Sequence, residues 1–256
     1  MRILISNDDG VYAKGIEVLA QHLQAQTDYD VTVVAPDRQR SAMGHAITLH
    51  KPLRVDSADI GTDIKAFKVN GTPSDCVKLG MHAICDEVPD IVISGINSGS
   101  NLGTDVFYSG TVSAAAEAAM SGIPSIAISA CGPEPFAYDQ AAEFLSKFLS
   151  KYDLQTFHKY GMLNINIPKS SKPIQGVRTT ILGRRVYSTT FVQREDPLGR
   201  TYYWLAGEEL VVENDDDTDV AAIAAGFISV TPIHFSLTDN KWVSELTDSF
   251  WQQRGI

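Results

Sequence analysis

Short apolar segments with the composition of buried β-strands recur through residues 1–169, and helical patterns separate them. These segments lie at 2–6, 30–37, 90–94, 125–129 and 162–167. After the first segment, Ile16, Leu19 and Leu23 follow the i, i+3, i+7 spacing of an amphipathic helix. Strands that are apolar on both faces and alternate with helices are typical of a parallel sheet covered by helices on both sides. The sequence therefore predicts an α/β fold with a doubly wound, mostly parallel sheet.

Two regions depart from this alternation. Apolar and polar residues alternate in 47–50, 53–55 and 64–69, which predicts antiparallel strands at the sheet edge. Beyond residue 170 the predicted elements are mainly strands: 177–181, 191–193, 201–205 and 227–235, with a turn at 196–199 and helices at 219–225 and 242–251. The turn and its flanking strands predict an extended β arm. Pro232 predicts an edge position for the last strand, because proline cannot donate to a sheet ladder.

Composition and charge exclude several classes of protein. The net charge of −10 argues against a broad basic face that binds polymeric nucleic acid. No apolar run approaches the ~20 residues that span a bilayer, and the chain enters a strand pattern at once, without a signal peptide. Cys76, Cys85 and Cys131 contain no C-x-x-C pair, so we expect reduced thiols in a cytoplasmic protein.

The first predicted strand ends in Asn7-Asp8-Asp9-Gly10. Adjacent carboxylates repel and raise each other's pKa unless a positive group lies between them, and a hard divalent cation prefers such oxygen ligands. The alternative is a plain polar turn. A helical pattern follows rather than a second alternating strand, so the stretch predicts strand, loop and helix, with a candidate metal site at the strand end.

Further polar clusters follow other strand ends or open helices. Ser41 offers a hydroxyl oxygen after the second strand, and Asn97 or Asn101 could supply a carbonyl oxygen to a metal. Ser109, Gly110 and Thr111 open a helix of small residues, whose N-terminus could hold a phosphate or could simply be capped. Because these clusters share one rim of the predicted sheet, they indicate a single site.

Other polar residues near these clusters do not require a role in catalysis. Arg38 and Arg40 either meet anions or lie in a solvated loop. A lone loop histidine such as His45 carries little information about catalysis. Thr72 and Asp75 fit the N-cap and third position of a helix, which explains them without a catalytic role.

Taken in order, these motifs resemble the SurE family of stationary-phase survival nucleotidases. The matching stretches are 5–10, 34–41, 70–76, 92–97, 101–103, 108–112 and 229–233. The resemblance implies a Rossmann-like core in residues 1–169. Residues 170–256 would form a β arm and C-terminal elements that reach across to a neighbour in a homodimer or homotetramer, all within one domain. The chain differs from many members of the family at Lys14, where they have proline. This difference bears on the rigidity of the loop and not on the metal-binding residues.

The resemblance also implies a metal-dependent phosphatase of nucleoside 5′- and 3′-monophosphates, with short polyphosphate as a further substrate of some members. It places one Mg²⁺ or Mn²⁺ per subunit on Asp8, Asp9, Ser41 and Asn97. We therefore expect Asp8, Asp9 and Asn97 to be catalytic, and Asn97, Ser109, Gly110 and Thr111 to bind the phosphate of the substrate. The alternative is a non-catalytic sensor of nucleotides or phosphometabolites that uses the same rim.

Overall fold

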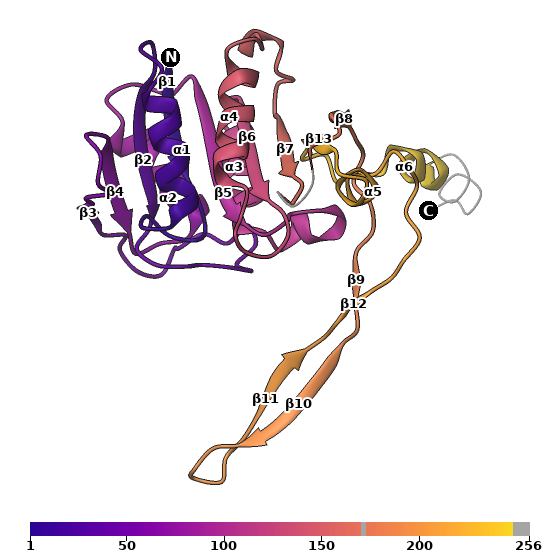
Figure 1. Cartoon of the computed structure of the whole chain (residues 1–256). Helices are drawn as coiled ribbons and strands as arrows, with labels where there is room; N and C mark the ends of the chain where they lie inside the picture. Colours follow the sequence, from indigo (N-terminus) through magenta and orange to yellow (C-terminus); the bar gives the residue numbers. More distant parts are fainter. Residues whose placement is uncertain (170–172, 248–256) are drawn as a thin grey trace.

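The strands predicted from the first 169 residues assemble into one mixed sheet, from which a β arm extends (Figure 1). The computed structural model describes residues 1–169 and 173–247. Up to residue 169 the elements are β1 (Arg2–Ser6), α1 (Lys14–Gln24), β2 (Asp30–Pro36), β3 (Val55–Ser57), β4 (Lys65–Val69), α2 (Pro73–Leu79), η1 (Gly80–Ile84), β5 (Ile91–Ser98), η2 (Gly103–Phe107), α3 (Gly110–Met120), β6 (Ser125–Ala130), α4 (Tyr138–Leu149), η3 (Leu154–Thr156) and β7 (Gly161–Ile167). The remaining elements are β8 (Val177–Thr179), β9 (Val186–Tyr187), β10 (Thr190–Glu195), β11 (Thr201–Ala206), β12 (Glu209–Leu210), α5 (Asp219–Ala224), β13 (Ile228–His234) and α6 (Asn240–Glu245).

The order of strands in the sheet creates a switch point beside β1. The order is β3-β4-β2-β1-β5-β6-β7-β13-β8, and neighbours from β4 to β7 are parallel. The chain leaves β1 for β2 on one side and later returns to β5 on the other. The carboxyl ends of β1 and β5 therefore adjoin at the position where open α/β sheets bind ligands.

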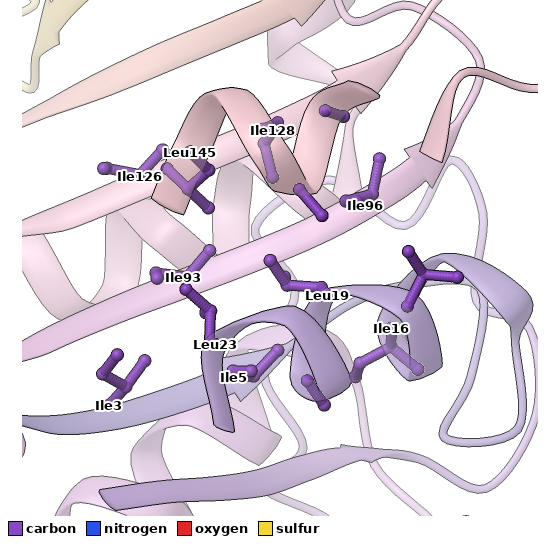
Figure 2. Packing of buried hydrophobic residues seen from close by; sticks show 14 of the residues in the cluster. Ile3, Ile5, Ile16, Leu19, Leu23, Ile93, Ile96, Ile126, Ile128 and Leu145 are labelled. Atoms are coloured by element: carbon purple, nitrogen blue, oxygen red, sulfur yellow. The ribbon is translucent and has the colours of Figure 1, made fainter. Parts of the chain in front are cut away.

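Helices cover both faces of the sheet, which confirms the doubly wound prediction. On one face, α1 and α4 pack against alternate strand residues. Figure 2 shows Leu19 and Leu23 of α1 near Ile5 and Ile93, and Leu145 of α4 beside Ile126. On the other face, α2 and α3 pack against the residues in between, such as Leu4 and Val92. This two-sided burial explains why the strands are apolar at consecutive positions.

The prediction for residues 46–69 is partly wrong. Residues 47–50 form no strand, and β4 lies parallel to β2 rather than antiparallel. Only the short β3 is antiparallel, where it pairs with β4. The alternating pattern reflects one-sided exposure at the sheet edge, and such exposure does not determine strand direction.

In the C-terminal region, the predicted β arm is confirmed, and the strand that contains Pro232 is only partly at the sheet edge. β10 and β11 form an antiparallel ladder that projects from the body (Figure 1). β13 lies between β7 and β8, but β8 pairs only with Ile228–Val230. Pro232 lies beyond that pairing, so its missing N–H falls on an open side of the strand. The predicted helix at 242–251 begins earlier, as α6, and residues 248–251 lie outside the described residues.

Two further findings concern the cysteines and the lengths of the helices. Cys76 and Cys131 are buried, Cys85 is partly buried, and all three are free thiols. Within the part of the chain that the structure describes, no helix combines the length and apolar character needed to cross a bilayer.

Candidate functional site

Asn7 holds the loop after β1 in one conformation. Its side chain is fully buried, donates from Nδ2 to the Gly10 carbonyl at 2.9 Å and accepts the Gly10 N–H at 3.1 Å. Gly10 has φ +102°, and a Cβ there would lie 3.1 Å from the carbonyl carbon of Arg38, so only glycine suits this turn. The closed loop presents Asp8 and Asp9 in fixed directions.

Asp8 lies against the start of α3. Asp8 is only 5 % exposed, and Thr111 Oγ1 donates a hydrogen bond to Asp8 Oδ1. Burial raises the pKa of Asp8 to about 6; the Thr111 hydrogen bond opposes this rise, and the negative charge of Asp9 adds to it. A Cβ on Gly110 would lie 2.7 Å from Asp8 Cβ, so the absence of a side chain at 110 makes this approach possible. The carboxylate thus faces the positive end of the α3 dipole.

Asp9 is bound to the end of β5. Ser98 donates its backbone N–H to Oδ2 at 3.0 Å and its hydroxyl to Oδ1 at 3.0 Å. The loop after β2 joins the same loop through the Arg40 N–H, which donates to the Asp8 carbonyl at 2.7 Å. The predicted rim is therefore real: the carboxylate loop contacts the end of β5, the start of α3 and the loop after β2.

Asn97 and Ser41 lie at this rim in different environments. Asn97 belongs to β5, and its Nδ2 donates to the Gly99 carbonyl at 2.9 Å, which makes Oδ1 the atom suited to a cation. Ser41 follows Arg40, and its side chain is exposed to solvent. Asn101, the alternative to Asn97, is buried and donates to Ser129 Oγ at 2.9 Å. Of the two asparagines, the structure leaves Asn97 as the better candidate ligand.

The start of α3 is capped by Ser109 and contacts Asp8. Ser109 is the N-cap, and its Oγ accepts the Val112 N–H at 3.0 Å. Thr111 is fully buried and its hydroxyl is used by Asp8. Capping thus accounts for Ser109, while Gly110 and Thr111 form a wall of small residues beside the carboxylates.

The donor set fits a hard divalent cation. Neighbouring cationic side chains pair with other carboxylates, Lys14 with Glu17 and Arg40 with Asp37, so within residues 1–169 and 173–247 no ion pair neutralises Asp8 or Asp9. The described residues contain no cluster of three or more His, Cys, Asp or Glu side chains that could hold a metal. Two carboxylates supplemented by neutral oxygens and water match the preference of Mg²⁺ better than that of Zn²⁺.

In the loop after β2, the side chains of Arg40 and His45 bind carboxylates other than Asp8 and Asp9, and the side chain of Arg38 is exposed. Arg38 is 72 % exposed at its side chain, whereas Arg40 donates to Asp37 at 3.1 Å. His45 Nε2 lies 2.9 Å from Glu117 Oε2. Burial alone would raise the pKa of Glu117, but hydrogen bonds from His45 and Lys78 outweigh it and hold that pKa below its usual value. His45 therefore fastens its loop to α3.

Thr72 and Asp75 cap α2, as predicted. Asp75 donates its N–H to Thr72 Oγ1 at 3.1 Å, and Thr72 donates its N–H to Asp75 Oδ2 at 2.9 Å. The second oxygen of Asp75 accepts the Thr48 N–H at 2.9 Å. The capping box thus also anchors the irregular segment before β3.

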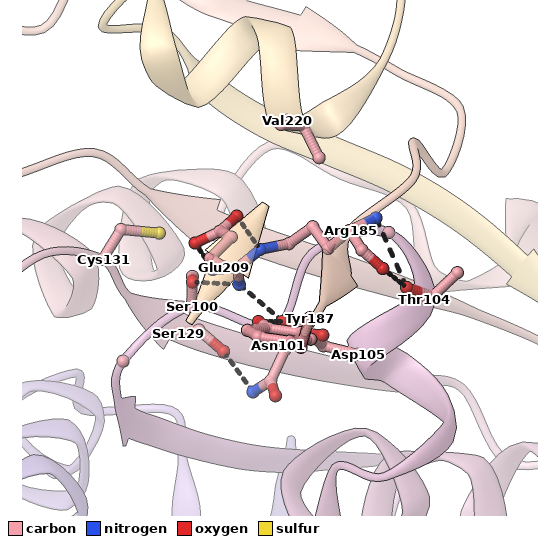
Figure 3. Close-up of polar contacts among 12 residues, drawn as sticks. Ser100, Asn101, Thr104, Asp105, Ser129, Cys131, Arg185, Tyr187, Glu209 and Val220 are labelled. Carbon is pink, nitrogen blue, oxygen red and sulfur yellow. Dashed lines mark hydrogen bonds and ion pairs between the residues drawn. The ribbon is translucent and has the colours of Figure 1, made fainter. Parts of the chain in front are cut away.

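Arg185 clamps the loop after β5 to the base of the arm. Figure 3 shows its guanidinium between Ser100, Asp105 and Glu209, with Nη1 donating to Ser100 Oγ at 3.1 Å and Nε to Glu209 at 2.7 Å. Tyr187 donates to the same Asp105 carboxylate at 2.9 Å. This network joins β9 and β12 to the segment that leads from Asn97 to α3.

Asp219 adds a second connection between these segments. Its carboxylate is fully buried and accepts the N–H groups of Gly103 and Gly183, both at 2.8 Å. Burial raises the pKa of Asp219, although these hydrogen bonds oppose the rise. The acidic run 213–219 therefore contains one structural carboxylate among its solvated neighbours.

Sequence reasoning missed Ser98, Arg185 and Asp219. Ser98 directly follows Asn97, and its place at a strand end was a usable signal. Arg185 and Asp219 act on residues 80 or more positions away, as their bonds to Asp105 and Gly103 show, and no local pattern marks such partners.

Comparisons with known proteins agree with this geometry. The model of a family described as Survival protein SurE matches residues 3–189. A curated "5'-nucleotidase SurE" from Caldanaerobacter subterraneus subsp. tengcongensis is 48% identical over 245 residues, 96% of this chain and 96% of the relative. One from Carboxydothermus hydrogenoformans is 50% identical over 250 residues, 96% of this chain and 95% of the relative. A crystal structure of SurE protein from Aquifex aeolicus has a TM-score of 0.81 and 39% identity, covering 99% of this chain and 100% of that one.

Proposed function

Because the chain belongs to the SurE family, we propose that it is a metal-dependent phosphatase that hydrolyses nucleoside 5′- and 3′-monophosphates to nucleoside and phosphate. The resemblance predicted from the motifs is thereby confirmed at the level of the family. The curated relatives carry the name of an enzyme and match almost the full chain, so the binding-only sensor is not favoured.

The observation that supports this function most strongly is the uncompensated carboxylate pair beside a helix N-terminus. A pure phosphate site gains from the α3 dipole and loses from Asp8 and Asp9. The pair is favourable only if a cation accompanies the phosphate. We therefore assign the cation to Asp8, Asp9 and Asn97, and propose Ser41 as a fourth ligand. The loop that carries Ser41 is bound to Asp8 by the hydrogen bond from the Arg40 N–H to the Asp8 carbonyl.

Different residues would bind the phosphate, orient it and accept the proton of the attacking water. When bound, a divalent cation would polarise the phosphoryl group and lower the pKa of a water molecule. Gly110 and Thr111 receive the phosphate at the positive end of α3, and Asn97 orients it from the end of β5. One carboxylate of the Asp8–Asp9 pair takes the proton that the attacking water loses.

Several finer points belong to the same proposal. We assign one Mg²⁺ or Mn²⁺ per subunit, a cytoplasmic location that the free thiols support, and short polyphosphate as a further substrate. We also propose one domain of residues 1–256 that forms a homodimer or homotetramer through its C-terminal elements. Exposed aromatic residues on the arm, among them Phe191, Tyr203 and Trp204, support association there.

The test compares phosphate release from 5′- and 3′-mononucleotides by the wild type, Asp8→Asn and Asp9→Asn. Asp56→Asn, which changes an exposed carboxylate on β3, is the matched control. Both site variants are expected to lose about 100-fold or more in kcat/KM, because each removes a charged ligand. Full turnover by either one, with Asp56→Asn also active, would contradict the assignment.

A further inference from the structure

A pocket of about 890 Å³ opens next to the carboxylate pair and includes Asp9 in its lining, and the steps above assign no role to the rest of its lining. Asp9 and Ser98 line the pocket together with the aromatic side chains of Phe136 and Tyr138, here called the aromatic wall. Its polar rim includes Glu134. We propose that this pocket binds the nucleoside part of the substrate, with the base stacked on the Phe136–Tyr138 pair; the proposal rests on the proposed phosphatase function.

The position of the pocket relative to the site supports this assignment. Asp9 and Ser98 belong to both, since Ser98 holds the Asp9 carboxylate with two hydrogen bonds. A phosphate placed beside Asp9 therefore has its ester substituent at the mouth of the pocket. The volume falls within the roughly 300–1,000 Å³ of small-molecule sites, which is ample for a nucleoside.

The aromatic wall is held in place from behind. The ring centroids of Phe136 and Tyr138 lie 5.5 Å apart, with 38° between the ring planes. Both side chains pack against the core under α1 and α4 and remain partly exposed on the pocket side. The Tyr138 ring also lies against the backbone at Gly15, where a Cβ would be 3.1 Å from Tyr138 Cε1. A fixed, half-exposed aromatic surface is suited to stacking a planar base of any identity.

A hydrogen bond of Tyr138 shows which end of its ring faces the carboxylates. The Tyr138 hydroxyl forms a hydrogen bond with Ser98, whose own hydroxyl donates to the Asp9 carboxylate. The hydroxyl end of the ring therefore lies near Asp9 and Ser98.

Charged groups at the rim fit the sugar. Glu134 is exposed, and a carboxylate accepts hydrogen bonds from ribose hydroxyls. Lys14 also lines the pocket, with its Nζ 2.9 Å from Glu17 Oε1.

The experiment compares Tyr138→Leu with Tyr138→Phe and with a matched control, Tyr152→Leu. Tyr152 follows the other end of α4 and stacks on Phe148, away from the pocket. The first readout is KM for 5′-AMP and for ribose 5-phosphate, which has no base. Tyr138→Leu is expected to raise KM for 5′-AMP about fivefold or more and to leave KM for ribose 5-phosphate unchanged. Tyr138→Phe keeps the ring and is expected to behave like the wild type.

The second readout is adenosine binding by calorimetry in EDTA, which requires neither metal nor turnover. The wild type, Tyr138→Phe and Tyr152→Leu are expected to bind adenosine, and Tyr138→Leu to bind it about fivefold or more weakly. If Tyr138→Leu fails to fold, Phe136→Leu replaces it in both assays.

The outcomes separate the two proposals. A wild type without turnover that binds adenosine through Tyr138 overturns the phosphatase and keeps the nucleoside pocket. An active wild type whose KM for 5′-AMP and adenosine affinity are unchanged in Tyr138→Leu overturns the pocket.

Discussion

Replacing Asp8 by asparagine should stabilise the metal-free protein at neutral and alkaline pH. The buried carboxylate has its pKa raised from 3.8 to about 6, chiefly by burial. At 1.36 kcal/mol per pKa unit, this difference corresponds to about 3 kcal/mol of unfavourable free energy in the folded state when Asp8 is ionised. Asparagine keeps an oxygen that accepts from Thr111 and carries no charge.

The pH dependence of this effect has a defined sign. For a carboxyl whose folded pKa is raised, the stabilising contribution is present below the unfolded pKa of 3.8 and is lost as the pH rises through about 6. Asp8→Asn should therefore exceed the wild type in free energy of unfolding by about 1–3 kcal/mol above pH ~7. The difference should vanish near pH ~4, where Asp8 is protonated in the folded state.

Urea denaturation of both proteins in EDTA, at about pH 8 and about pH 4, measures this difference. Asp56→Asn is the control, since its exposed carboxylate should leave stability within about 0.5 kcal/mol of the wild type. Addition of Mg²⁺ should then raise the stability of the wild type more than that of Asp8→Asn. An Asp8→Asn protein that is no more stable than the wild type at about pH 8 would refute the reasoning.

Three other substitutions test the site and its support. Gly110→Ala should lower kcat/KM for 5′-AMP about 100-fold, because the new Cβ would lie 2.9 Å from Asp8 Oδ2. Asn97→Ala should raise the Mg²⁺ or Mn²⁺ concentration that gives half-maximal activity in the same reaction by about tenfold or more, because the cation loses a ligand. Arg185→Met should lower the free energy of unfolding by about 2–3 kcal/mol, because the Asp105 carboxylate loses its counter-charge and keeps only the hydrogen bond from Tyr187, whereas the exposed Arg184→Met should change it by less than about 0.5 kcal/mol.

The central sheet and the rim of the site could be predicted because their signals are local. Consecutive apolar residues such as Ile3, Leu4 and Ile5 are required when both faces of a strand are buried. The polar residues at the strand ends then fall on one rim through the topology of the sheet alone. Asp8 and Asp9 were therefore recognisable before any side-chain geometry was known.

The direction and register of a strand, and the hydrogen bonds between residues far apart in the chain, could not be predicted from these local signals. The alternation in 64–69 indicated an edge strand but carried no information on whether it runs parallel to β2. The hydrogen bond from the Thr111 hydroxyl to Asp8, 103 residues away in the chain, is a second contact without a local signal. Such contacts depend on how α3 is placed on the sheet, which local periodicity does not specify.

In the proposed function, the carboxylate pair needs a cation to hydrolyse a phosphate ester. The most direct measurement is phosphate release from 5′-AMP by metal-stripped protein, titrated with Mg²⁺ or Mn²⁺ in parallel with an EDTA series. The account predicts no release in EDTA and a saturable return of activity with either cation. Undiminished release from the folded protein in EDTA would contradict it.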